Sequence, residues 1–164
     1  MLNRGLQQII DRLNANLSRD VIVQTTVNQL RQQLQVDRVV LYYFYKKWEG
    51  RVTFESLSSE KFSILGSTGP DECFNDEYAE LYFKGRVRAI PDIEIEPIHP
   101  CHRDYLRNLH VRANLAVPVL SQGKLWGLLI AHHCQDAHTW PLSDIQEMQK
   151  AAQSLGTAPS IQQN

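Results

Sequence analysis

Two apolar stretches near the C-terminal end of the chain constrain its fold more than any other feature. They cover residues 114–120 and 125–132, and a turn-forming tetrapeptide, Ser121-Gln-Gly-Lys124, separates them. Short apolar runs joined by a Gly-containing turn predict a β-hairpin. Because nearly every position in both runs is apolar, we expect this hairpin to form the core of a sheet.

The first third of the chain predicts two helices and a second strand pair. Apolar residues recur at three- and four-residue spacing through residues 2–17 and again through 21–34, as is typical of amphipathic helices. The β-branched and aromatic run at 39–45 predicts a strand, and residues 51–57 alternate as its hairpin partner. The sheet is therefore expected to be at least partly antiparallel.

Between the two strand pairs the sequence predicts loops and short helices. A short helix is expected near residues 76–84, and prolines make residues 86–100 irregular, because proline cannot occupy a helix interior or a central strand. A further helical segment begins near Cys101. Ser143 and Gln146 form a predicted capping box at the start of the last helix.

Composition limits the classes of partner. At 164 residues and 43% hydrophobic, the chain fits one globular domain that can bury a core and a ligand. Its 17 basic and 18 acidic residues give a net charge of −1 without a basic block, so neither nucleic acid nor a membrane surface is an expected partner. No apolar run approaches the ~20 residues of a membrane span, which predicts a soluble, cytoplasmic domain.

Two of the three cysteines lie in settings that suit chemistry with a ligand. Cys73 lies in Asp71-Glu72-Cys73-Phe74, within a predicted loop, and Cys101 precedes His102 at a predicted helix start. A thiol is a nucleophile only as thiolate, which helix starts and nearby positive charges favour. Taken alone, each cysteine can equally be structural.

The odd number of cysteines, without a Cys-x-x-Cys pair, favours free thiols over a disulfide framework. The Cys and His residues also lack the paired spacing of zinc sites, so no metal is expected.

Several segments together resemble the light-sensing GAF domains of cyanobacteriochromes, relatives of phytochromes that hold a linear tetrapyrrole (bilin) by a thioether to cysteine. The resemblance runs from about Val36 to Gln149, and the Asp-x-Cys-Phe motif at 71–74 is similar to that of the dual-cysteine subfamily. The supporting segments are Asp37–Tyr42, Gly85–Val87, Cys101–His102, Val111–Pro118 and Gly127–Cys134.

The resemblance implies an α+β GAF fold. A central antiparallel sheet would carry the terminal helices on one face and a ligand pocket under loops and short helices on the other. Residues 1–164 would form a single GAF domain, with N-terminal helices in 1–35, the sheet and pocket in 36–134 and a C-terminal helix in 143–156. Relatives continue in a long helix, whereas Gly156 and Pro159 here predict a break.

The resemblance also assigns roles to individual residues. Cys101 would form the permanent thioether to the first ring of the bilin. Cys73 would add reversibly to the central methine bridge, and Asp71 would accept hydrogen bonds from the pyrrole nitrogens. The other expected chromophore-binding residues are Phe74, Arg86, His102, Tyr105 and His132.

The implied function is a photosensory domain with reversible blue/green-type photoconversion, driven by Z/E isomerisation of phycocyanobilin and/or phycoviolobilin. Besides the covalently bound bilin, its partners would be a signalling output domain or partner protein, and a second copy in a homodimer. Self-catalysed chromophore attachment would be its only chemistry, so it is not expected to be an enzyme. The alternatives are a GAF domain that senses redox state through Cys73 and Cys101 or binds a cyclic nucleotide, and a dimerisation module.

Overall fold

The structure, a computed structural model, describes residues 4–46, 49–69 and 76–163. Within this part of the chain, no helix is both long enough and apolar enough to cross a bilayer. In chain order the elements are α1 (Arg4–Arg19), α2 (Val21–Leu34), β1 (Arg38–Phe44), β2 (Gly50–Leu57), the 3₁₀ turn η1 (Glu60–Phe62), α3 (Asp76–Phe83), β3 (Arg88–Ile90), α4 (Pro100–Asn108), β4 (Ala113–Ser121), β5 (Lys124–His133), α5 (Leu142–Leu155) and α6 (Pro159–Gln162).

The five strands form one antiparallel sheet in the order β2-β1-β5-β4-β3. The predicted hairpin is confirmed as β4 and β5, and both of these strands have a neighbour on either side. The earlier strand pair, β1 and β2, joins β5 through β1. The predicted α+β architecture is therefore correct.

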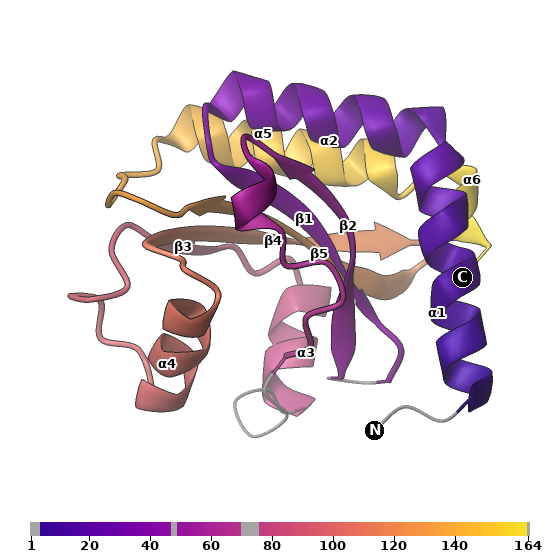
Figure 1. Cartoon of the computed structure of the whole chain (residues 1–164), viewed down its shortest axis with the longest axis horizontal. Helices are drawn as coiled ribbons and strands as arrows, with labels where there is room; N and C mark the ends of the chain where they lie inside the picture. Colours follow the sequence, from indigo (N-terminus) through magenta and orange to yellow (C-terminus); the bar gives the residue numbers. More distant parts are fainter. Residues whose placement is uncertain (1–3, 47–48, 70–75, 164) are drawn as a thin grey trace.

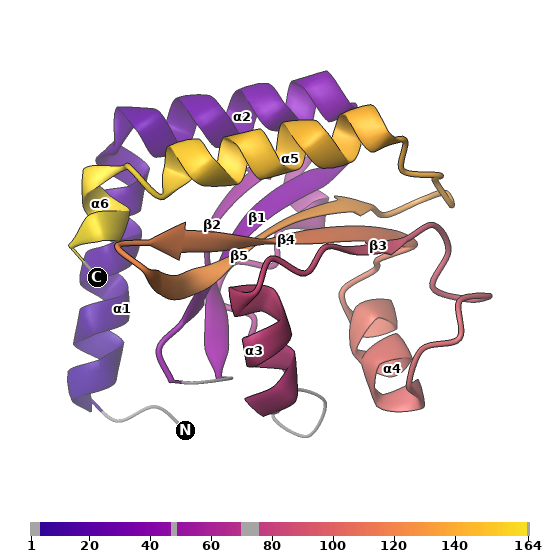
Figure 2. The same cartoon turned by 180° about the vertical axis from the view of Figure 1, so that it is seen from behind.

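Helices cover the two faces of the sheet unequally. On one face α2 and α5 lie side by side across the strands, and α3 and α4 lie on the side of the other face (Figures 1 and 2). The face under α2 and α5 forms the main core, where apolar side chains of both helices pack against β1, β4 and β5. The opposite face, toward α3 and α4, carries a smaller apolar cluster.

Two details differ from the sequence prediction. The edge strand β3 lies inside the stretch predicted to be irregular, where Pro91 directly follows its last residue. The predicted capping box is wrong, because α5 already begins at Leu142, with Pro141 as N-cap and no capping side chain. Ser143 is therefore inside the first turn and cannot act as its cap.

The predicted break after α5 is present, and it leads into a tertiary contact. After Gly156 the chain turns into α6, whose residue Ile161 is fully buried in the main core. Asp20, the N-cap of α2, accepts hydrogen bonds from Ile22 N and Val23 N through Oδ1. Its Oδ2 accepts from Ser160 N at 3.0 Å and from Ser160 Oγ at 2.6 Å. One carboxylate thus holds the start of α2 and the start of α6 together.

Replacing Asp20 with alanine is expected to lower the free energy of unfolding by about 2 kcal/mol, because it removes a helix cap and leaves the Ser160 donors without their acceptor. Urea denaturation followed by circular dichroism measures this loss. Asp11→Ala is the matched control, since Asp11 is exposed on α1 and accepts one bond, from Gln7 Nε2 at 2.8 Å. Equal effects of the two substitutions would contradict the capping role.

Candidate functional site

A pocket lies between the sheet face opposite α2 and α5 and the helices α3 and α4. Side chains alternate along each strand, so odd-numbered residues of β1 and β4 and residues 129 and 131 of β5 enter the main core, whereas their even-numbered neighbours 128, 130 and 132 of β5, and those of β1 and β4, face the pocket. The sheet contributes Val40, Tyr42, Val52, Asn114, Ala116, Leu128, Ile130 and His132 to its lining. The floor is thus mainly apolar, with polar groups at one end.

The polar end is a row of three cross-strand neighbours. Arg38 pairs with His132 across β1 and β5, and Asn114 pairs with His132 across β4 and β5. Arg38 Nε donates to His132 Nδ1 at 3.0 Å, and His132 Nε2 lies 3.0 Å from Asn114 Oδ1. The guanidinium also donates to the carbonyls of Phe62 and Leu109, at 2.6 Å each. A fully buried cation therefore ties β1 to β5, to η1 and to the end of α4.

These contacts fix the tautomer of His132. Burial, reinforced by the nearby positive charge of Arg38, holds the pKa of His132 well below its usual value, so the ring is neutral. Because guanidinium nitrogens only donate, Nδ1 must accept and the proton resides on Nε2. Nε2–H then donates to Asn114 Oδ1, which leaves the Asn114 amide nitrogen as a donor at the pocket.

Helix α4 supplies the opposite wall through His102, Tyr105, Leu106 and Leu109, and α3 supplies Tyr82. Burial, followed by the positive charges of Arg88 and Arg86, lowers the pKa of His102 to about 4. Burial also raises the pKa of Tyr105 to about 12. At neutral pH both groups are therefore uncharged and can pack against an apolar ligand or hydrogen-bond to it.

The low pKa of His102 predicts a pH dependence of stability. Between about pH 4 and 6.5 the unfolded chain binds a proton at this position and the folded chain does not, so stability is lost as the pH falls through this window. We expect His102→Gln to have a smaller slope of unfolding free energy against pH between 5 and 6.5, measured by urea titrations. His110→Gln, an exposed change on the same side of the domain, is the control. An unchanged slope in His102→Gln would show that His102 titrates normally.

Cys101 lies in the first turn of α4 and is half-buried. Its N–H donates to Nδ1 of His99, the N-cap residue, at 3.0 Å. The expectation of free thiols does not hold here, because Cys101 is disulfide-bonded.

Cys134 is a free cysteine, and burial raises its pKa to about 11, which makes it a poor nucleophile at neutral pH.

The remaining expected site residues are placed unevenly. Arg86 follows α3 and lies over the Tyr82 ring, with its guanidinium carbon 5.7 Å from the ring centre. It is outside the pocket lining, yet its charge reaches His102. Asp71, Cys73 and Phe74 lie outside the described residues.

Arg38 and Asn114 were not among the site residues predicted from the sequence. A signal for Arg38 existed in the Asp37-Arg38 pair at the start of a buried strand, where a cation needs partners. No local signal exists for Asn114, because its partner depends on strand register.

Comparisons with known proteins agree with this geometry. The GAF domain family matches residues 18–158. An uncharacterized protein of Picosynechococcus is 47% identical, over 94% of this chain and 95% of its own length. A Synechocystis protein described as a methyl-accepting chemotaxis protein is 33% identical over 93% of this chain, which spans 15% of that protein.

Among solved structures, the blue-light absorbing form of the Thermosynechococcus elongatus PixJ GAF domain is 32% identical, with a TM-score of 0.78, over 92% of this chain and 87% of that one. A phycocyanobilin-bound GAF domain from a cyanobacterial phytochrome is 27% identical, with a TM-score of 0.75, over 99% of this chain and 96% of that one. The chain shares the fold of these structures, belongs to the GAF domain family and is of the cyanobacteriochrome and phytochrome type.

Proposed function

We propose that this chain is a bilin-binding photosensory domain. The observation that carries the proposal is the pocket itself: an apolar floor with a polar row at one end, closed by the helix that carries Cys101 and His102. Similar GAF domains of known structure, one of them named as phycocyanobilin-bound, support this assignment.

The pocket residues fit the chemistry of a linear tetrapyrrole. Such a molecule is a flat apolar chain of four rings that carries carbonyl oxygens, N–H groups and two carboxylates. The aliphatic floor and the neutral His102 and Tyr105 suit the rings, and the Asn114 amide can donate to an oxygen. Arg86 and Arg88, whose charges lower the pKa of His102, are near enough to attract carboxylates.

In this proposal Cys101 provides the permanent attachment. Its Sγ adds to the side-chain double bond of the first ring. The S–C bond forms as the C=C π bond opens, and the proton released by the thiol returns to the bilin, so no oxidant is needed. The disulfide at Cys101 must first be reduced. The domain then catalyses its own modification and no further turnover.

In the proposal Cys73 forms a second, reversible bond to the bilin, and Asp71 accepts hydrogen bonds from its pyrrole nitrogens. The Cys73 thiolate adds to the central methine bridge, shortens the conjugated system and shifts absorption toward blue. Light isomerises the double bond between the third and fourth rings when the bilin is bound. The response of the pocket releases Cys73, and the green-absorbing form results. Phycocyanobilin and phycoviolobilin are both candidate pigments, and the signal passes to an output domain or partner protein.

The test is an absorption spectrum of protein co-expressed with a phycocyanobilin pathway and purified with a reductant, recorded after blue and then green light. The wild type is expected to convert reversibly between blue- and green-absorbing forms, and Cys73→Ala to lack the blue-absorbing form. Pigmented wild type whose blue form survives in Cys73→Ala would refute the second-cysteine mechanism. Colourless wild type would refute the bilin proposal.

One observation favours a second candidate, redox sensing, because Cys101 is disulfide-bonded. In that case the colourless protein would switch on oxidation of Cys101 without any pigment. Mass spectrometry of alkylated protein across a thiol–disulfide buffer series would then show a reversible transition in a colourless wild type.

A further inference from the structure

Helix α4 packs against the loop that precedes it. Ile93 and Ile98 of this loop pack with Leu106 and Val111 in a small apolar cluster separate from the main core. In Figure 2, α4 lies below the sheet at the β3 end, and the loop from β3 runs outward before it returns to the helix. The position of the first turn of α4, which carries Cys101, therefore depends on what holds this loop.

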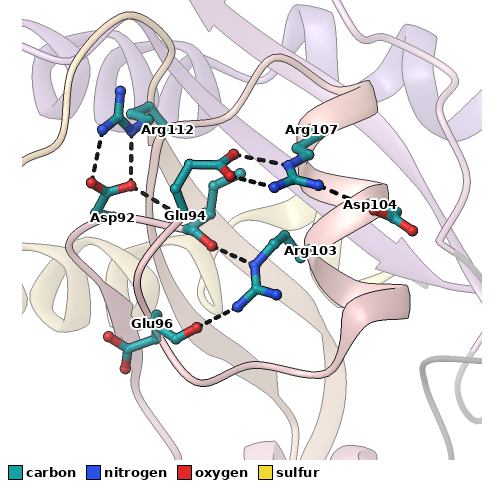
Figure 3. Close-up of polar contacts among 8 residues, drawn as sticks. Asp92, Glu94, Glu96, Arg103, Asp104, Arg107 and Arg112 are labelled. Carbon is teal, nitrogen blue, oxygen red and sulfur yellow. Dashed lines mark hydrogen bonds and ion pairs between the residues drawn. The ribbon is translucent and has the colours of Figure 1, made fainter.

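Three arginines hold the loop, and all of them lie in or just after α4 (Figure 3). Arg112 donates from Nε and Nη2 to the two carboxylate oxygens of Asp92, each at 2.8 Å. Arg107 forms a bidentate pair with Glu94. Arg103 donates to Ile93 O at 2.8 Å and to Glu96 O at 2.6 Å.

The three contacts differ in how directly they bear on Cys101. The Arg107–Glu94 pair joins two solvent-exposed side chains, 51% and 38% accessible, and such pairs contribute little. The Arg112–Asp92 pair lies at the base of the loop, where the backbone is already held by Ile93 N donating to Arg112 O at 2.9 Å. Neither pair is needed to hold the far part of the loop against the first turn of α4.

Arg103 is different because both of its acceptors are backbone carbonyls. Its guanidinium therefore holds the chain itself at Ile93 and Glu96, and the loop cannot move away from α4 without breaking two charge-assisted hydrogen bonds. Arg103 N also donates to the carbonyl of the N-cap residue His99 at 3.0 Å. Arg103 thus connects the far part of the loop to the turn that carries Cys101 and His102.

We propose that Arg103 is the positioning residue for Cys101, acting by clamping the loop of residues 93–96 to the first turn of α4. This inference rests on the proposed function for its consequence, which is that the thiol faces the first ring of a bilin at the reacting distance. Small displacements of a reacting atom are costly, so loss of the clamp is expected to slow attachment without weakening the binding of bilin in the pocket.

The first measurement is the rate of covalent attachment when purified, reduced protein is mixed with phycocyanobilin at several concentrations. Arg103→Ala is expected to attach bilin about tenfold more slowly at saturation, with an unchanged half-saturating concentration. Arg103→Lys should be intermediate, since an ammonium lacks the planar fork that reaches two carbonyls. Arg107→Ala, one turn further along α4, should stay within about twofold of wild type.

A core variant separates positioning from general loss of stability. Met148 is fully buried in α5 on the opposite face of the sheet, so Met148→Ala destabilises the domain away from α4. We expect it to attach bilin at nearly the wild-type rate. The inference is overturned if Arg103→Ala attaches at the wild-type rate, or if Arg107→Ala or Met148→Ala is equally slow.

Hydrogen–deuterium exchange of the pigment-free protein makes the test independent of the bilin. Arg103→Ala is expected to raise exchange in residues 98–106 and leave β5 protected, whereas Arg107→Ala should not. If the wild type binds no bilin but this pattern appears, the proposed function fails and the anchoring role of Arg103 stands. If exchange in residues 98–106 is unchanged, the anchoring role fails whether or not bilin attaches.

Discussion

An Arg38→Met variant is expected to lose about 3 kcal/mol of its free energy of unfolding. The substitution removes the donor to His132 Nδ1 and to the carbonyls of Phe62 and Leu109, in a place without solvent access. Each buried acceptor left without a donor costs about 1–3 kcal/mol, which relief from burying a charge offsets only in part. Urea denaturation followed by circular dichroism measures the loss.

The matched control is Arg31→Met, because Arg31 is a half-buried arginine on α2 that donates one side-chain bond, from Nε to Ser56 Oγ at 2.9 Å. We expect it to lose less than about 1 kcal/mol. Arg38→Lys should fall between the two, since one ammonium cannot reach three acceptors that are arranged around a planar group. If Arg38→Met were as stable as Arg31→Met, the prediction would be wrong. The free-energy cost of burying the guanidinium would then cancel the stabilisation from its three hydrogen bonds.

Cys101→Ala is expected to abolish covalent pigment in protein co-expressed with a phycocyanobilin pathway, whereas Cys134→Ala keeps it. Cys101 lies at the start of α4, beside the pocket wall, where the helix end favours the thiolate. Cys134 is half-buried, and its raised pKa of about 11 keeps it protonated. Zinc-enhanced fluorescence of the denatured protein on a gel detects covalently bound bilin.

The pair of variants also distinguishes the origins of a negative result. Pigment that is absent from both variants but present in wild type would point to a folding defect, which circular dichroism of each variant detects. Covalent pigment retained in Cys101→Ala would place the attachment at another thiol and contradict the proposed role of Cys101.

The sequence was most informative where the pattern is local and repeated. Helical periodicity predicted α2 over residues 21–34, as observed, and the two apolar runs predicted the β4–β5 hairpin. These predictions succeed because a helix or strand that buries one face needs apolar residues at its own fixed spacing, whatever the fold. The capping box at Ser143 failed because α5 begins at Leu142, with Pro141 as its N-cap, so that Ser143 lies within the first turn.

Motif reading also selected residues that lie together at one pocket. His102 and Tyr105 of α4 and His132 of β5 line this pocket, and Cys101 lies in the first turn of α4. These residues could be selected because they lie in short segments that resemble a family. The roles of these residues stay predictions, as do those of Arg86, Asp71, Cys73 and Phe74.

The sequence by itself determined the strand and helix pattern and the position of Cys101 at a helix start, because these depend on neighbours along the chain. Tertiary structure alone decided the polar row of Arg38, His132 and Asn114. A regular hairpin closed by Ser121 and Lys124 would set Asn114 opposite Ala131, but an irregularity between Val119 and Leu120 shifts the register so that Asn114 faces His132. One residue of shift moves a side chain to the other face of a sheet, and pairing of β5 with the distant β1 then adds Arg38. Such register depends on long-range packing, which local pattern does not encode.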